Sequence, residues 1–188
     1  MTTILVTGGS GTLGTHVVSR LRREGHDVRV LSRRPGAGTH HGDLSTGAGV
    51  EAAVRGASVV VHAASDTRRF GRRDERQTRH LLAACSGVDH LVYISIVGID
   101  RIPYSYYRAK LRVEEIIASS GVPHSILRAT QFHELMDVGL GFLSRLPVAP
   151  LPLDFRFQPL AAAEPLITWP AWPPARWRVG FPTSAVPT

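Results

Sequence analysis

Tyr106 and Lys110 are the residues of this chain whose types and spacing best suit chemistry. They are four positions apart, so a helix places both side chains on one face. Lys110 is the single lysine among 22 Lys and Arg residues, which indicates that this position requires a compact ammonium. A unit charge about 4 Å from a phenol is worth about 4 kcal/mol at an effective dielectric near 20, enough to bring the tyrosine pKa from about 10 toward 7. Such a phenol serves as a general acid or base.

Ser95 is the third candidate catalytic residue. It ends the apolar segment Leu91–Ile94, and its hydroxyl is expected to hydrogen-bond a substrate oxygen. Tyr107 has Leu111 at its fourth position, so it is a poorer proton donor or acceptor than its neighbour. An ordinary surface Tyr–Lys pair on a helix remains the alternative to a catalytic pair.

A glycine-rich segment near the N-terminus predicts a dinucleotide site. The apolar segment Ile4–Val6 leads into glycines spaced G-x-x-G-x-x-G, and an amphipathic helix follows. Glycines allow a sharp turn and close approach to a pyrophosphate, and the helix N-terminus supplies N–H groups. A plain turn between strand and helix would not need all three glycines. The predicted cofactor-binding residues of this segment are Gly8, Gly9, Ser10, Gly11, Thr12, Leu13 and Gly14.

The end of the second expected strand favours NADP(H), with NAD(H) left open. An NAD site usually has an acid there, whereas this chain has Ser32 followed by Arg33 and Arg34. Arginine can grip a 2′-phosphate through paired, charged hydrogen bonds; two solvated turn residues are the alternative. Further residues expected beside the cofactor are Asp43 and Leu44 after the third strand, and the small residues Ala63, Ala64 and Ser65 after the fourth.

The elements that must position these residues alternate along the chain, which predicts an α/β fold with a doubly wound parallel sheet of the Rossmann type, in the strand order 3-2-1-4-5-6. The expected strands are Thr3–Thr7, Asp27–Ser32, a short one near His40–Gly42, Ser58–His62, His90–Ser95 and His124–Arg128. The expected helices are Thr12–Glu24, Ala48–Arg55, Arg72–Ser86, Tyr104–Ser120 and Phe132–Arg145. The ligand crevice is expected at the carboxyl ends of the strands.

Composition changes toward the C-terminus. Ten of the 13 prolines and all three tryptophans follow residue 146, and proline at this density breaks helices and strands. We therefore expect a dinucleotide-binding domain over residues 1–160 and an irregular Pro/Trp-rich tail over residues 161–188. The abrupt change after Ala163 suggests the hypothesis of a truncated or frame-shifted chain, which sequencing the gene would test.

Composition also bears on partners and compartment. The net charge is +7, but the one arginine cluster, from Arg68 to Arg79, has the spacing of a solvated helical face, so nucleic-acid binding is not expected. Cys85 is the single cysteine, and the chain shows neither a signal peptide nor an apolar run long enough to span a membrane. We expect a cytoplasmic protein that binds no membrane. The scattered histidines, including His40-His41 and His133, form no recognised metal set, so no metal site is expected.

These motifs together resemble the short-chain dehydrogenase/reductase superfamily, and most closely its extended and atypical NAD(P)H-binding branch of NmrA-like and epimerase-like proteins. The resemblance covers about residues 1–160. Family members often have asparagine where His80 stands and proline where Ala129 stands. The segments that carry the resemblance are Thr7–Gly14, Gly42–Leu44, Ser95, Tyr106-x-x-x-Lys110, Thr78–Leu82 and Leu127–Phe132.

The resemblance implies an NAD(P)-dependent oxidoreductase acting on a small-molecule carbonyl or alcohol. It implies that Tyr106 donates or accepts the proton, that Lys110 binds the cofactor ribose and tunes the phenol, and that Ser95 orients the substrate. Relatives continue for roughly another hundred residues into a substrate lobe, which this chain replaces with its tail. A non-catalytic NADP(H) sensor and a nucleotide-sugar epimerase or dehydratase remain alternatives, and a homodimer is plausible by analogy alone.

Overall fold

The computed structural model describes residues 2–34, 36, 38–101 and 103–129. The expected helix Phe132–Arg145, the domain boundary at residue 160 and the tail over residues 161–188 lie outside the described residues.

The described chain is built on a six-stranded parallel sheet in the order β3-β2-β1-β4-β5-β6, which confirms the predicted Rossmann topology. The strands are β1 (Thr3–Thr7), β2 (Asp27–Ser32), β3 (Thr39–His41), β4 (Val59–His62), β5 (His90–Ile96) and β6 (His124–Ala129). Every described pairing is parallel, with Thr7 of β1 opposite His62 of β4 and His62 opposite Tyr93 of β5. The carboxyl ends of all the strands therefore lie along one edge of the sheet.

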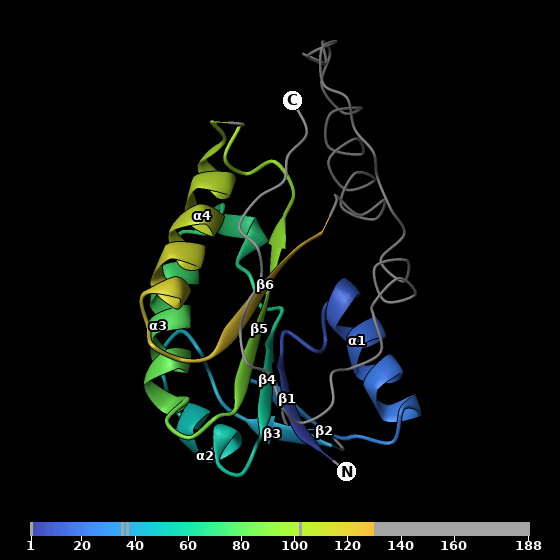
Figure 1. Cartoon of the computed structure of the whole chain (residues 1–188). Coiled ribbons are helices and arrows are strands. Elements are labelled where there is room, and N and C mark those ends of the chain that lie inside the picture. Colours follow the sequence, from blue (N-terminus) through green and yellow to red (C-terminus); the bar gives the residue numbers. More distant parts are fainter. Residues whose placement is uncertain (1, 35, 37, 102, 130–188) are drawn as a thin grey trace.

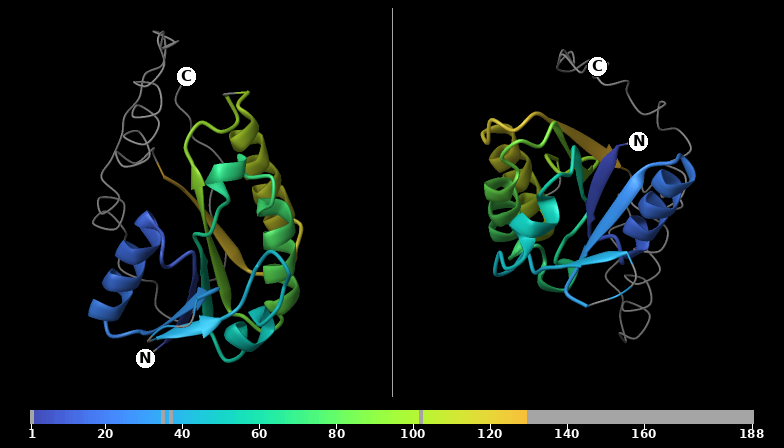
Figure 2. Two further views of the ribbon diagram at one scale, coloured as in Figure 1. Left: turned by 180° about the vertical axis from the view of Figure 1, so that it is seen from behind. Right: turned by 90° about the horizontal axis from the view of Figure 1, so that it is seen from below.

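Helices cover both faces of this sheet (Figures 1 and 2). Helix α1 lies on one face, and α2, α3 and α4 lie together on the other. A short 3₁₀ helix, η1 (Thr67–Arg69), lies between β4 and α3. The helices are α1 (Thr12–Arg23), α2 (Val50–Val54), α3 (Asp74–Ala84) and α4 (Ser105–Ala118).

The alternation of side chains along each strand divides the apolar residues between two cores. Ile4 and Val6 of β1 face α1, whereas Leu5 between them faces α2, α3 and α4, and all three are 0% exposed. Both faces of the central strands are covered, which accounts for their continuous apolar sequences.

The start of α3 departs from the prediction. The sequence predicts a helix from Arg72, but α3 begins at Asp74, because Phe70 (φ 53°) and Gly71 (φ 72°) both adopt the left-handed region. The expectation that the arginines of the Arg68–Arg79 cluster share one helical face is therefore wrong. Arg69 belongs to η1, and of this cluster α3 contains Arg76 and Arg79. Similarly, α2 is shorter than Ala48–Arg55.

Candidate cofactor and active site

The glycine loop between β1 and α1 requires glycine at two positions. Gly8 adopts a φ of 72°, and a Cβ there would lie 2.6 Å from the backbone nitrogen of Ala64. A Cβ on Gly14 would lie 2.0 Å from the carbonyl oxygen of Gly8. The loop therefore packs tightly on itself and against Ala63 and Ala64 at the end of β4, which a plain turn would not require.

Helix α1 begins directly after this loop. Gly11 is its N-cap and contributes no side-chain hydrogen bond, and the first turn of the helix carries no acidic residue. The first-turn N–H groups and the positive end of the helix dipole are thus left for an anionic ligand. Ser10 and Thr12 are exposed beside them, and Leu13 is half-buried against the α1 core.

The predicted NADP residues lie at the end of β2. Arg33 and Arg34 are both exposed, and the backbone N–H of Arg34 donates to Ser32 Oγ at 3.1 Å. A groove of about 590 Å³ opens beside the glycine loop, and α1 contributes two arginines to it that the sequence analysis did not single out. The groove is lined by Gly9, Ser10, Thr15, Val18, Ser19, Arg22, Arg23, Val30, Gly38 and Thr39.

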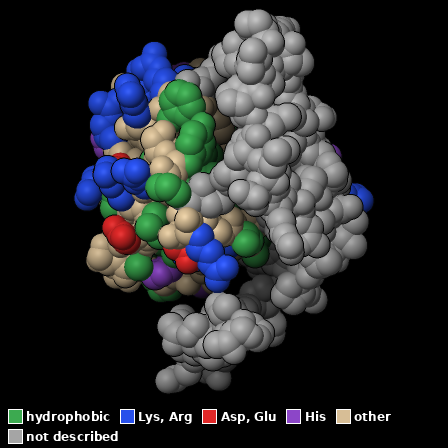
Figure 3. Space-filling model, turned by 90° about the horizontal axis from the view of Figure 1, so that it is seen from above, with side chains coloured by type: hydrophobic (Ala, Val, Ile, Leu, Met, Phe, Trp, Pro, Cys, Tyr) green, Lys and Arg blue, Asp and Glu red, His purple; other side chains and the backbone are tan. Residues whose placement is uncertain are grey.

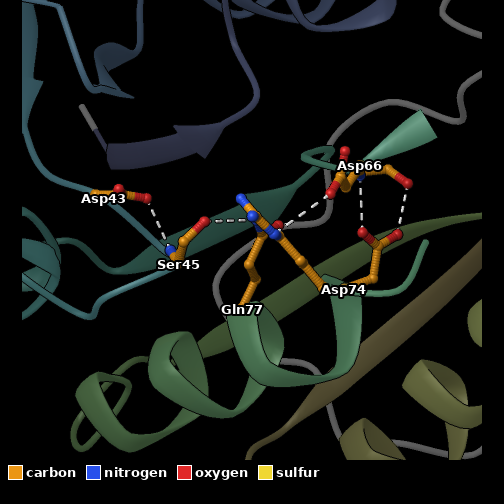
Figure 4. A network of polar contacts seen from close by, with 7 residues as sticks. Asp43, Ser45, Asp66, Asp74 and Gln77 are labelled. Atoms are coloured by element: carbon orange, nitrogen blue, oxygen red, sulfur yellow. Dashed lines mark hydrogen bonds and ion pairs between the residues drawn. The ribbon is translucent and has the colours of Figure 1, made fainter. Parts of the chain in front are cut away.

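The residues predicted after β3 have different environments. Asp43 is half-buried and accepts a hydrogen bond from the backbone N–H of Ser45 at 2.8 Å, while Ser45 Oγ accepts one from Gln77 of α3 at 3.0 Å (Figure 4). Leu44 is buried, and its carbonyl oxygen lies 2.7 Å from Nδ1 of His80. Asp43 thus shapes the loop, and Leu44 belongs to the core.

Helix α4 places Tyr106 and Lys110 on one buried face, as their spacing predicts. They are 9% and 4% exposed, so the alternative of a surface pair is wrong. The Nζ atom of Lys110 donates to the carbonyl oxygen of Ile94 at 3.3 Å and lies 4.8 Å from the ring centroid of Tyr93. It lies farther, 6.0 Å, from the ring centroid of Tyr106.

Ser95 lies next to the β5 carbonyl that Lys110 contacts. Its side chain is 2% exposed, and within the described residues its Oγ has no hydrogen-bond partner. A buried hydroxyl without a partner is uncommon and consistent with a ligand-binding role. The structure records no hydrogen bond between Ser95 and Tyr106 among these residues.

The phenol of Tyr106 instead contacts Ser65, a residue predicted to line the cofactor ribose. Tyr106 Oη lies 3.0 Å from Ser65 Oγ, and Ser65 Oγ donates to Asp74 Oδ2 at 2.5 Å. The second carboxyl oxygen of Asp74 accepts a hydrogen bond from the backbone N–H of Asp66 at 2.7 Å (Figure 4). The sequence analysis missed Asp74, because an acid in the first turn of a helix is ordinarily explained by the helix dipole.

The expectation that Lys110 lowers the pKa of Tyr106 toward 7 is wrong for this structure. Burial, together with the negative charge of Asp74, raises the pKa of Tyr106 to about 12. Burial also lowers the pKa of Lys110 to about 8, and the charge of Lys110 acts on Asp74 and His62. Both side chains are removed from water, which disfavours their charged forms. Asp74 also hydrogen-bonds Ser65, the partner of the phenol, so its negative charge disfavours a phenolate at Tyr106.

His62, at the end of β4, joins the sheet to α3 beneath this site. Its Nδ1 lies 2.7 Å from Thr7 Oγ1, and its Nε2 lies 3.1 Å from Thr78 Oγ1. The ring is 1% exposed, and burial lowers its pKa to about 3. His62 is therefore a neutral structural residue near neutral pH.

Apolar side chains lie outside the Tyr106 site. Phe70, Val97 and Tyr104 are each about half exposed, and the rings of Phe70 and Tyr104 meet edge to face at 6.1 Å. Figure 3 views this end of the molecule and shows hydrophobic side chains gathered there with basic side chains beside them.

The described residues contain no group of three or more His, Cys, Asp or Glu suited to a metal ion. No helix in the described ranges is long and apolar enough to cross a membrane.

Comparison with known proteins identifies the family. A family model described as NAD(P)H-binding matches residues 8–142, which include the glycine loop and the Tyr106–Lys110 helix. The chain belongs to this NAD(P)H-binding family, within the extended branch of the short-chain dehydrogenase/reductase superfamily. The family assignment agrees with the sheet order and with the resemblance of the sequence motifs.

Three relatives illustrate the family. Divinyl chlorophyllide a 8-vinyl-reductase of Oryza sativa subsp. indica is 32% identical, over 70% of this chain and 40% of the relative. A 3-beta-hydroxysteroid dehydrogenase of Mycolicibacterium neoaurum is 31% identical, over 54% of this chain and 31% of the relative. A short-chain dehydrogenase/reductase superfamily protein of Agrobacterium tumefaciens, solved with bound NAD, is 28% identical with a TM-score of 0.60, over 70% of this chain and 50% of that one.

This chain spans at most half the length of these family members. Its own residues nevertheless fit a dinucleotide. The close packing of Gly8 and Gly14 forms a backbone cradle that any side chain would fill. The buried hydroxyl of Ser95, for which the described residues provide no hydrogen-bond partner, and the buried amine of Lys110 lie at the same edge of the sheet. These features are those a dinucleotide-binding family requires at this edge.

Proposed function

We propose that the chain is an NADP(H)-dependent oxidoreductase that interconverts a small carbonyl compound and its alcohol. The observation that carries the proposal is the burial of Tyr106 and Lys110 on one face of α4. Both lie at the carboxyl edge of the sheet, where the glycine loop follows β1. The names of two curated relatives, a reductase and a dehydrogenase, support redox chemistry for this chain.

Each residue has a defined role in this proposal. The glycine loop and the first turn of α1 bind the pyrophosphate. The small side chains of Ala63 and Ala64 leave room for the cofactor ribose. Lys110 uses one of its three donors on Ile94 and directs others toward ribose hydroxyls. Ser95 orients the substrate oxygen, and Tyr106 exchanges a proton with that oxygen. When bound, the nicotinamide supplies or accepts the hydride.

The preference for NADP(H) over NAD(H) rests on positive charge at the end of β2. Arg33 and Arg34 are exposed there, and Arg22 and Arg23 line the neighbouring groove. The guanidinium groups of Arg33 and Arg34 at the end of β2 favour a 2′-phosphate through charged hydrogen bonds.

Titration of the protein with NADPH and NADH, followed by nicotinamide fluorescence, tests cofactor binding. We expect NADPH to bind more tightly than NADH. Replacing Arg33 or Arg34 by serine should weaken NADPH binding by about 10–100-fold, since a hydrogen bond to a charged group contributes roughly 1.5–3 kcal/mol. NADH binding should be unchanged. Arg55→Ser, which alters an exposed arginine at the end of α2, is the matched control. Equal affinities for both nucleotides would contradict the preference.

Turnover is then tested with NADPH and a panel of ketones, aldehydes and quinones. We expect Tyr106→Phe to lower kcat by about 10²–10⁴-fold, the usual contribution of general acid–base catalysis, with little change in NADPH affinity. NADPH binding without turnover of any carbonyl compound would contradict the oxidoreductase proposal and favour a sensor.

A further inference from the structure

While Asp74 is a charged carboxylate, the hydrogen bonds around Ser65 run in one direction. Ser65 has one hydroxyl hydrogen, and the carboxylate of Asp74 can only accept, so that hydrogen is committed to Asp74 Oδ2 at 2.5 Å. Toward Tyr106, 3.0 Å away, Ser65 therefore acts as the acceptor and the phenol donates. The phenol thus presents its lone pairs, rather than its hydrogen, to any other ligand.

Asp74 is well placed to end this chain of hydrogen bonds. Its side chain is 2% exposed, and the backbone N–H of Asp66 holds its other oxygen at 2.7 Å. Because the two bonds are 3.0 and 2.5 Å long, Asp74 Oδ2 and Tyr106 Oη lie within about 5.5 Å of each other. Burial raises the pKa of this carboxyl, and the hydrogen bonds from Ser65 and Asp66 together with the positive charge of Lys110 oppose that effect.

We propose that Asp74, acting through Ser65, is the proton-storing end of a Tyr106–Ser65–Asp74 relay. The inference rests on the proposed function for its substrate. In alcohol oxidation, the substrate O–H bond breaks and its proton passes to Tyr106 Oη. The phenol proton passes to Ser65 Oγ, and the Ser65 proton passes to Asp74 Oδ2. The carbon–hydrogen electron pair leaves as hydride to the oxidised nicotinamide nucleotide, and a carbonyl forms. Carbonyl reduction runs the same transfers in reverse.

The relay allows Tyr106 to take a proton from the substrate without first becoming a phenolate. Burial raises the pKa of Tyr106 to about 12, so a free phenolate is scarce near neutral pH. With a relay, Tyr106 accepts one proton while giving up another, so it never has to carry the charge. In oxidation the arriving proton neutralises the negative charge of Asp74, and burial, which raises the pKa of this carboxyl above its ordinary value, favours that protonation.

Titration of the Tyr106 phenol by ultraviolet absorbance tests the relay without cofactor or substrate. Subtracting the curve of Tyr106→Phe isolates this phenol from the other three tyrosines. Asp74→Asn should lower the Tyr106 pKa by roughly one to two units, since it removes a charge within about 5.5 Å. Ser65→Ala should raise it, because the Ser65 hydrogen bond favours the phenolate. Asp89→Asn, at an exposed position, is the matched control.

We expect the pKa of Tyr106 to fall in Asp74→Asn and to rise in Ser65→Ala. A merely structural disturbance would move this pKa in the same direction in both variants. The charged or titratable groups that face the relay are Asp66, Tyr93, Tyr104, Tyr107, Lys110 and Glu114, and all are kept in every variant. Shifts of the same sign, or none, would overturn the relay.

The pH profile of kcat provides the second readout. The native protein should show a limb set by Asp74, and Asp74→Asn should lose that limb while its KM for NADPH stays within about twofold. An unchanged profile in Asp74→Asn would overturn the relay. Absence of turnover in the native protein would instead contradict the proposed function, and the phenol titration would still decide whether the three residues are coupled.

Discussion

Acidification should destabilise this protein through His62. Burial lowers the pKa of His62 to about 3 in the folded chain, against 6.5 for an ordinary histidine. Between these values the unfolded chain binds a proton that the folded chain does not, so the free energy of unfolding falls as the pH falls below about 6.5. The slope is about 1.4 kcal/mol per pH unit, and between pH 8 and pH 5 the loss amounts to about 2 kcal/mol.

The cause of this loss lies in the packing of the ring. His62 is 1% exposed, its two nitrogens lie against the hydroxyls of Thr7 and Thr78, and the positive charge of Lys110 disfavours protonation further. The ring also lies 5.4 Å from the ring of Tyr93, centroid to centroid. A protonated imidazole would be a second buried cation near Lys110, which burial alone makes costly.

Urea unfolding at pH 8, 7, 6 and 5 measures the effect. The native chain is compared with His62→Gln, whose amide keeps a donor and an acceptor but does not titrate. The difference in the free energy of unfolding between the two should shrink by about 2 kcal/mol between pH 8 and pH 5. His16→Gln, at an exposed position of α1, should leave the pH dependence of the free energy of unfolding as it is in the native chain. A constant difference, or an NMR signal of the His62 ring that titrates between pH 8 and pH 5, would refute the reasoning.

Two further predictions follow from the glycine loop and from Lys110. Gly14→Ala should cost about 1–3 kcal/mol in urea unfolding and abolish NADPH binding, because its Cβ would lie 2.0 Å from the Gly8 carbonyl oxygen. Gly25→Ala, where a Cβ meets nothing within 4 Å, should cost about 1–2 kcal/mol through its φ of 82° and leave binding intact. A [¹⁵N]lysine-labelled chain should give one side-chain signal, from Lys110, with a pKa of about 8; titration near 10.5 would contradict its burial.

Much of the fold could be predicted because its signals are local. The apolar segments Ile4–Val6, Val59–Val61 and Leu91–Ile94 are too short for helices and lie between turn residues, so their identity as strands follows from the chain alone. The alternation of strands and helices then restricts the sheet to parallel, right-handed connections. The start of α3 was not predictable in this way, since the left-handed conformation of Phe70 has no clear signal in the sequence.

The sequence by itself determined that Tyr106 and Lys110 share a helical face and that the glycine loop lies at the carboxyl edge, whereas the tertiary structure decided which other residues contact the phenol. The spacing of Tyr106 and Lys110 requires a shared helical face, because helix geometry is set by neighbours along the chain. Burial and contacts across elements are set by packing among distant segments, so they have no local signal. Only the tertiary structure places Ser65 and Asp74 beside the phenol and raises the pKa of Tyr106 where the sequence predicted a lowering. The charge on Asp74 and the loss of water around Tyr106 are the physical reasons for that reversal.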